Sequence, residues 1–276
     1  MSNLDKAIKL IEEGAPIAGA AVGAALGVMT SGPLMAASGG AAGAVMGKIV
    51  EDAAHRLLSR RERVRVGATA WYALDFTRAR LQAGEKIRED GFFEKREFGS
   101  TPAEEIFDGV LVKARKDHEE RKARFYGKFF SNLAFDTTCS RDAANYFLYL
   151  LDRLTYSQLA IIALFSHPKN FALSDQANEF KKVNNALEQT LLATFELIQS
   201  GLLKLWYKDT RPEVVVDMAE IRASDVKLSR SGARLYALAG LDLIPQKERE
   251  DMAAIFNSAD RAGGVEMEER SKLLNR

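Results

Sequence analysis

Residues 101–114, TPAEEIFDGVLVKA, carry the clearest helix signal in the chain and indicate its fold class. Thr101 is a typical N-cap, Pro102 suits the first helical position, and Glu104 completes a capping box three residues after the cap. The apolar side chains recur at the spacing of one helix face, which comprises Ala103, Ile106, Phe107, Val110, Leu111 and Ala114. The stretch therefore predicts an amphipathic helix of about three turns.

Two contrasting segments follow this helix. The run from Lys113 to Arg124 contains six basic and three acidic residues, and we expect it to form a solvated face. The next segment is an aromatic block at helical spacing, made of Phe125, Tyr126, Phe129, Phe130, Leu133 and Phe135. Large apolar side chains at this spacing are typical of a buried helix, so we assign the block to the core and not to a ligand pocket.

Two more helices are predicted from their start signals. Ser140 is expected to cap a helix whose buried face comprises Ala143, Phe147, Leu150, Leu151 and Leu154. Thr155 and Gln158 form a capping box for the helix after it. The run 159–165 is apolar on all sides, a pattern that a buried strand shares, and the capping box favours a helix.

Upstream, residues 51 to about 86 are predicted to form one long helix, with Gly67 as the place for a kink. The expected buried face comprises Leu57, Val64, Ala68 and Trp71.

The N-terminal region differs in composition from the rest of the chain. The 34 residues from Gly14 to Gly47 contain no ionisable side chain, and glycine recurs every four residues on either side of a turn sequence at 30–33. On a helix, such a stripe is a groove without side chains where another backbone can approach closely. We predict a glycine-zipper helical hairpin with arms at 16–30 and 34–50, whose self-assembly or membrane contact uses Gly19, Gly23, Gly27, Gly39, Gly43 and Gly47.

Two environments suit this hairpin. Each arm is only about 22 to 26 Å long, against a hydrocarbon layer of about 30 Å, so a stable two-pass span needs membrane thinning or oligomerisation. A basic cluster opposed only by Glu62 follows, and we predict that it contacts anionic lipid through Arg56, Arg60, Arg61, Arg63 and Arg65. The alternative is a small-residue hairpin packed inside a water-soluble helical core, with the arginines solvated.

The C-terminal part has the element order of a winged-helix module. A helix containing Leu187 to Ile198 is expected to end at Gly201 in the left-handed conformation, and two strand candidates follow at 202–207 and 226–228. Ser229 then starts another helix. There is no Lys or Arg between Val183 and Leu203, so phosphate contacts are missing where a DNA-reading helix would need them, and nucleic acid is an unlikely partner.

Composition excludes several classes of function. The 276 residues carry a net charge of +1, so no chain-wide field favours nucleic acid or an anionic surface. Cys139 is the single cysteine, which excludes an internal disulfide, and with no basic export signal it points to a cytoplasmic protein. The three histidines lack ligand spacing, and no phosphate-binding or nucleophile motif is present. We therefore expect no enzyme activity, no metal and no cofactor.

Three segments carry a resemblance to a known family. They are FYGKFFSNLAFD (Phe125–Asp136), YFLYLLDRLTYSQLAIIALF (Tyr146–Phe165) and LSRSGARL (Leu228–Leu235). Over roughly residues 50–245 the chain distantly resembles the Abi-alpha abortive-infection family of bacterial proteins. The resemblance implies an antiphage protein that halts or kills the infected cell, and it supplies no catalytic residues. The glycine hairpin is an addition to the family pattern.

Together these observations predict a mainly α protein with four parts: the hairpin at 1–50, a helical domain at 51–154, a winged-helix-like domain with a small β-hairpin at 155–245, and a helical tail at 246–276. The expected function is a non-enzymatic antiphage effector in the cytoplasm that associates conditionally with the inner membrane. Its expected partners are anionic inner-membrane lipid, further copies of itself and an unknown trigger or partner protein. The alternative is a soluble winged-helix regulator or adaptor that binds nucleic acid or a partner protein.

Overall fold

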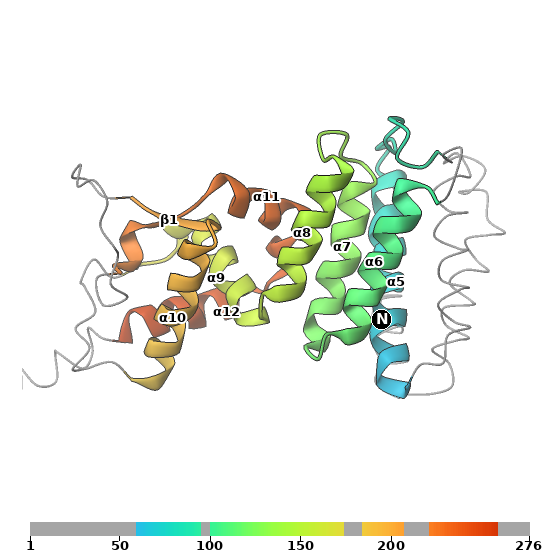
Figure 1. Ribbon diagram of the computed structural model, residues 1–276. Coiled ribbons are helices and arrows are strands. Elements are labelled where there is room, and N and C mark those ends of the chain that lie inside the picture. The colour runs from blue at the N-terminus through green and yellow to red at the C-terminus, as the bar shows by residue number, and fades with distance from the viewer. Residues whose placement is uncertain (1–58, 95–99, 174–183, 207–220, 259–276) are drawn as a thin grey trace, which may run out of the picture. The chain divides into compact units, whose positions relative to one another are not determined.

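The computed structural model describes residues 59–94, 100–173, 184–206 and 221–258 (Figure 1). This part of the chain contains eight α-helices, labelled α5 to α12, short 3-10 turns and one two-stranded antiparallel sheet. The prediction of a mainly helical protein with a small sheet is confirmed. The predicted hairpin at 1–50 lies outside the described residues.

The described chain divides into two compact units. The first contains the residues up to Leu154 together with Leu238–Gly240, and the second contains Thr155–Ala237 and the residues from Leu241 onward.

The described part of the first unit begins at Ser59, which is followed by helix α5, Arg60–Gln82. The Ser59 hydroxyl accepts the N–H of Glu62 and the Glu62 carboxylate accepts the N–H of Ser59, so a capping box fixes the start of the helix. The prediction of one unbroken helix from residue 51 to about 86 is therefore wrong at Ser59, whose backbone is extended, and the helix also ends earlier, at Gln82. Residues 51–58, including the predicted face residue Leu57, lie outside the described residues. Ser59 and Glu62 have the spacing of a capping box, so this helix start has a signal in the sequence.

The buried face of α5 also differs from the predicted one. Ala68 is buried as expected, but Val64 and Trp71 are only partly buried, and the centre of the face is built from small side chains: Thr69, Ala70, Ala73 and Thr77. The reason is the neighbouring helix α7, Ala123–Leu133, whose Gly127 lies against the α5 backbone. Only small side chains fit where two helix backbones approach so closely.

Helix α6, Pro102–Lys116, confirms the prediction made for its sequence. The Thr101–Glu104 capping box is formed, and all six residues of the predicted stripe are buried. Helix α6 packs against α5, α7 and α8, Arg141–Arg153, as Figure 1 shows. Ser140 caps α8 as predicted. Five of the six residues of the aromatic block lie in α7 and are buried, with the Phe107 and Phe130 rings 4.4 Å apart, whereas Phe135 follows α7 and is only partly buried.

The segment between α5 and α6 is anchored by a buried arginine. The guanidinium group of Arg88 pairs with Asp90 and donates to the backbone carbonyls of Leu133 and Cys139. Cys139, the single cysteine of the chain, is buried.

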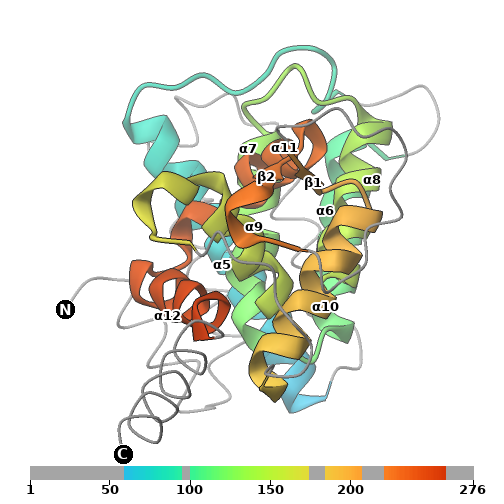
Figure 2. The same cartoon turned by 90° about the vertical axis from the view of Figure 1, so that its left-hand side faces the viewer.

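Helix α9, Tyr156–Ser166, is the central helix of the second unit (Figure 2). Its predicted capping box between Thr155 and Gln158 is present. The helix packs against α10, Asn185–Gln199, α12, Gln246–Phe256, and strand β2, Val226–Leu228. Residues 159–165 are apolar on every side of the helix, and all of them are buried. The prediction of a buried helix is therefore confirmed.

The two predicted strands pair with each other. Strand β1, Leu203–Leu205, is antiparallel to β2, with Leu203 opposite Leu228 and Leu205 opposite Val226. Gly201 has a φ of 71°, so the predicted left-handed end of α10 is confirmed. Helix α11, Arg230–Ala239, follows β2 and packs so closely that a Cβ on Gly232 would lie 2.0 Å from the carbonyl oxygen of Leu202.

Candidate functional site

The predicted membrane and self-assembly residues are Gly19, Gly23, Gly27, Gly39, Gly43 and Gly47, and all of them lie outside the described residues, as does Arg56. The other four arginines of the predicted lipid-contact cluster, which are Arg60, Arg61, Arg63 and Arg65, lie in the first two turns of α5. Arg61 is exposed.

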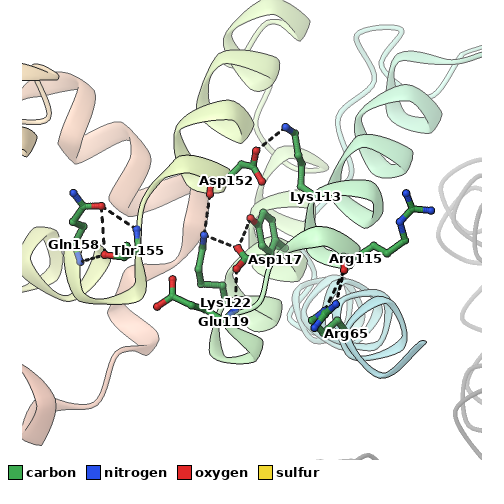
Figure 3. Close-up of polar contacts among 10 residues, drawn as sticks. Arg65, Lys113, Arg115, Asp117, Glu119, Lys122, Asp152, Thr155 and Gln158 are labelled. Carbon is green, nitrogen blue, oxygen red and sulfur yellow. Dashed lines mark hydrogen bonds and ion pairs between the residues drawn. The ribbon is translucent and has the colours of Figure 1, made fainter. Parts of the chain in front are cut away.

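Arg65 has an intramolecular role. Its Nε and Nη2 atoms donate to the backbone carbonyl of Arg115, at 3.2 and 2.8 Å, so it joins α5 to the end of α6 (Figure 3). Glu62 lies within the arginine cluster. Hydrogen bonds from Ser59, followed by the charges of Arg115 and Arg65, lower the pKa of its carboxyl and keep it ionised.

The charge run at 113–124 contains the most buried ionic cluster among the described residues. Lys122 and Asp117 have side chains that are only 2% and 7% exposed, and their charged atoms lie 2.6 Å apart (Figure 3). The expectation that this run is solvated is therefore wrong for these two residues. The remaining pattern is as expected for a surface run, since Lys116, His118, Glu120 and Arg121 are exposed.

The buried pair is held by three elements. Lys122 ends the 3-10 turn η1, Glu120–Lys122, and also donates to the backbone carbonyl of Asp152 in the last turn of α8, at 3.2 Å. The side chain of Asp152 forms a second ion pair, at 2.6 Å, with Lys113 of α6. A cation at the C-terminus of a helix satisfies a free carbonyl and the helix dipole, so the cluster fastens the α6–α7 corner to the end of α8.

The hydrogen bonds of Asp117 decide its protonation. Burial raises the pKa of this carboxyl, but the hydrogen bonds from Lys122, the Glu119 N–H and the Tyr126 hydroxyl outweigh burial, and the pKa lies below its usual value. Burial and the charge of Asp117 raise the pKa of Tyr126. Asp117 therefore stays ionised and Tyr126 stays neutral, which is the state of a structural ion pair.

A second polar feature lies on the outer face of the two-stranded sheet. Lys204 and Lys227 stand directly opposite each other, and both are exposed. Trp206, two residues along from Lys204, is 54% exposed, and the two ammonium groups lie 5.9 and 4.5 Å from its ring centroid. We call Lys204, Trp206 and Lys227 the sheet patch. The alternation K-L-W at 204–206 and K-L at 227–228 is its signal in the sequence, and none of its three residues is among the predicted site residues.

The described residues contain neither a cluster of potential metal ligands nor a single helix that could span a membrane. Within them, no group of three or more His, Cys, Asp or Glu side chains is placed to hold a metal ion. Of the helices in this part of the chain, none is by itself long and apolar enough to cross a membrane, although α8 and α9 meet the criteria when they are taken together as a bent pair.

Comparison of the chain with protein-family models, with curated proteins and with solved structures gave no match.

Proposed function

We propose that the protein is a non-enzymatic bacterial effector of the abortive-infection kind, in which residues 14–50 act on the inner membrane or on further copies of the chain. The observation that carries this proposal is the stretch of 34 residues without an ionisable side chain, which holds two glycine stripes and is followed by the arginine cluster. The resemblance of 125–136 and 146–165 to the Abi-alpha family supplies the antiphage context.

Helices associate in lipid for other reasons than in water. Hydrophobicity does not drive association there, so close backbone packing between small residues takes its place, and stripes of glycine at every fourth position permit it. Basic residues beside such a segment add about 1 kcal/mol each near an anionic leaflet. Arg61, which is exposed on the first turn of α5, is in a position to contribute in this way.

The two helical units serve in this proposal as the scaffold that shelters the glycine hairpin until a trigger releases it. For residues 155–245 we propose a winged-helix-like module that contacts protein, based on the order of α10, β1, β2 and α11. The protein would then be cytoplasmic and reach the inner membrane only conditionally or at its periphery.

The test is to replace one glycine in each stripe with leucine, which places a large side chain in the groove. Gly23→Leu with Gly43→Leu should abolish membrane damage, measured as dye entry into expressing cells, while circular dichroism and the thermal transition of the helical units stay unchanged. Ala25→Leu with Ala41→Leu is the matched control, because it adds similar bulk on the opposite helix face. Equal membrane damage from the glycine double variant and the unaltered chain would remove the proposal.

The alternative function is a soluble regulator or adaptor, and the paired strands between α10 and α11 favour it. Flotation with liposomes that contain anionic lipid separates the two functions. A protein that never floats, with or without truncation, and that shifts a nucleic acid duplex at physiological salt would support the regulator. A defined oligomer without either activity would instead indicate an assembly subunit.

A further inference from the structure

The sheet patch places two positive charges directly opposite each other, with the Trp206 ring as the contact that the structure gives to both ammonium groups. Lys204 and Lys227 are directly opposite each other in the antiparallel register, and like charges in this position destabilise a sheet. Among the described residues, no carboxylate forms an ion pair with either ammonium group. The charges are therefore free to meet an anion from outside this part of the chain.

The aromatic side chain of the patch is also open to solvent. The ring of Trp206 is approached by the two ammonium groups, and more than half of its surface is exposed. Arg222 and Arg230, which flank β2 in the sequence, are exposed as well. An open indole beside two cations has the composition of a platform on which a base stacks while cations hold the phosphates.

We propose that the sheet patch binds single-stranded nucleic acid without sequence preference, with one base stacked on Trp206 and the adjoining phosphates on Lys204 and Lys227. This inference does not rest on the proposed membrane function. It differs from duplex reading by a recognition helix, for which α10 lacks the cations. The chain-wide charge of +1 does not oppose it, because the cations are gathered locally.

A lipid surface is the other anionic partner to consider, and the composition of the patch disfavours it. Binding to a membrane interface scales with the apolar area that is buried, and Trp206 is the only large exposed apolar side chain on the described part of the sheet. A stacked base needs just one aromatic face and neighbouring cations. The patch offers these and no wider apolar surface.

Fluorescence gives a direct test because the chain has only two tryptophans. In the full-length Trp71→Phe variant, Trp206 is the sole tryptophan, and an oligothymidylate of about 20 nucleotides should quench its emission. Trp206→Leu in the otherwise unaltered chain should weaken oligonucleotide binding by about 5- to 150-fold, measured by fluorescence anisotropy of a labelled strand. A retained thermal transition shows that the exposed substitution leaves the fold intact.

The salt dependence tests the lysines separately. Lys204→Gln with Lys227→Gln removes two phosphate contacts, so the slope of log affinity against log salt should fall in magnitude by about 1.4. Lys86→Gln with Lys116→Gln removes two exposed charges from the first unit and is the matched control, which should leave the slope unchanged.

Each contrary result overturns the proposal. One is the absence of quenching and of strand binding by the unaltered chain at about 50 mM salt. Another is strand binding that persists unchanged in both the Trp206→Leu and the double lysine variants, since the strand would then bind elsewhere. The last is a Trp206 emission that responds to phosphatidylglycerol vesicles and not to the oligonucleotide, which would assign the patch to lipid.

Discussion

The ammonium group of Lys122 lies 2.6 Å from a carboxylate oxygen of Asp117, and both side chains are almost completely removed from solvent. A buried ion pair of this kind is costly to break from one side, because the remaining charge has no water to replace its partner. The pair also orients the Tyr126 hydroxyl, which donates to Asp117 at 2.9 Å. The corner between α6 and α7 therefore depends on two charges that must be present together.

Removing one charge should destabilise the first unit strongly. Lys122→Met is expected to lower the free energy of unfolding by about 3–5 kcal/mol, and Asp117→Asn by a similar amount, in urea titrations followed by circular dichroism. The double variant should lose less than the sum of the two, with a coupling of about 0.5–3 kcal/mol. Lys113→Met, which breaks the partly exposed pair with Asp152, is the control and should cost at most about 1 kcal/mol. Strictly additive losses would contradict the paired arrangement.

The same carboxylate predicts a dependence on pH. The folded pKa of Asp117 is lowered, so its ionisation stabilises the fold above the unfolded value of about 3.9, and this stabilisation is lost as the pH falls through the folded value. The stability difference between the unaltered chain and Asp117→Asn should be constant from about pH 7 to 5 and should narrow below about pH 4. Chemical denaturation at each pH measures it. If the difference in unfolding free energy between the two proteins widens as the pH falls, the pKa of Asp117 is not lowered by folding.

Replacement by alanine should change the stability of the first unit differently at two helical glycines, Gly127 and Gly109. A Cβ on Gly127 would lie 2.6–2.8 Å from Tyr72, Thr69 and Ala73, mostly from backbone atoms, so Gly127→Ala should destabilise the first unit by about 1–3 kcal/mol. At Gly109 the nearest atom is the end of the Leu148 side chain at 3.3 Å. Gly109→Ala should be neutral or should stabilise by up to about 1 kcal/mol, because alanine favours helix. Thermal unfolding of both variants measures this difference. Similar melting temperatures for Gly127→Ala and Gly109→Ala would contradict the close contact of α5 and α7.

The start of α5 can be tested by the sign of one substitution. If Ser59 is the N-cap, Ser59→Ala should lower stability by about 1 kcal/mol. If the helix ran on from residue 51, Ser59 would be an interior position and alanine would raise stability slightly. Ser140→Ala, at the cap of α8, provides the reference loss in the same unit.

The predictions that the structure confirms are those that depend on residues close in sequence. The capping boxes at Thr101 and Thr155, the cap at Ser140 and the left-handed Gly201 each involve residues within a few positions of one another. The stripe of α6 was correct in every residue because large apolar side chains marked it. The face of α5 was misjudged because small residues fill it, and small residues carry no strong periodic signal.

The sequence by itself therefore determined the helical class, most helix starts and the two strands, since capping and periodicity act within about four residues. Tertiary structure alone decided that Lys122 is buried, because its partner carbonyl at Asp152 is supplied by another helix. It also decided that Lys204 faces Lys227, because a register between separate strands is set by which residues reach the core. Burial and pairing depend on what the chain brings together from a distance, and no local pattern encodes that.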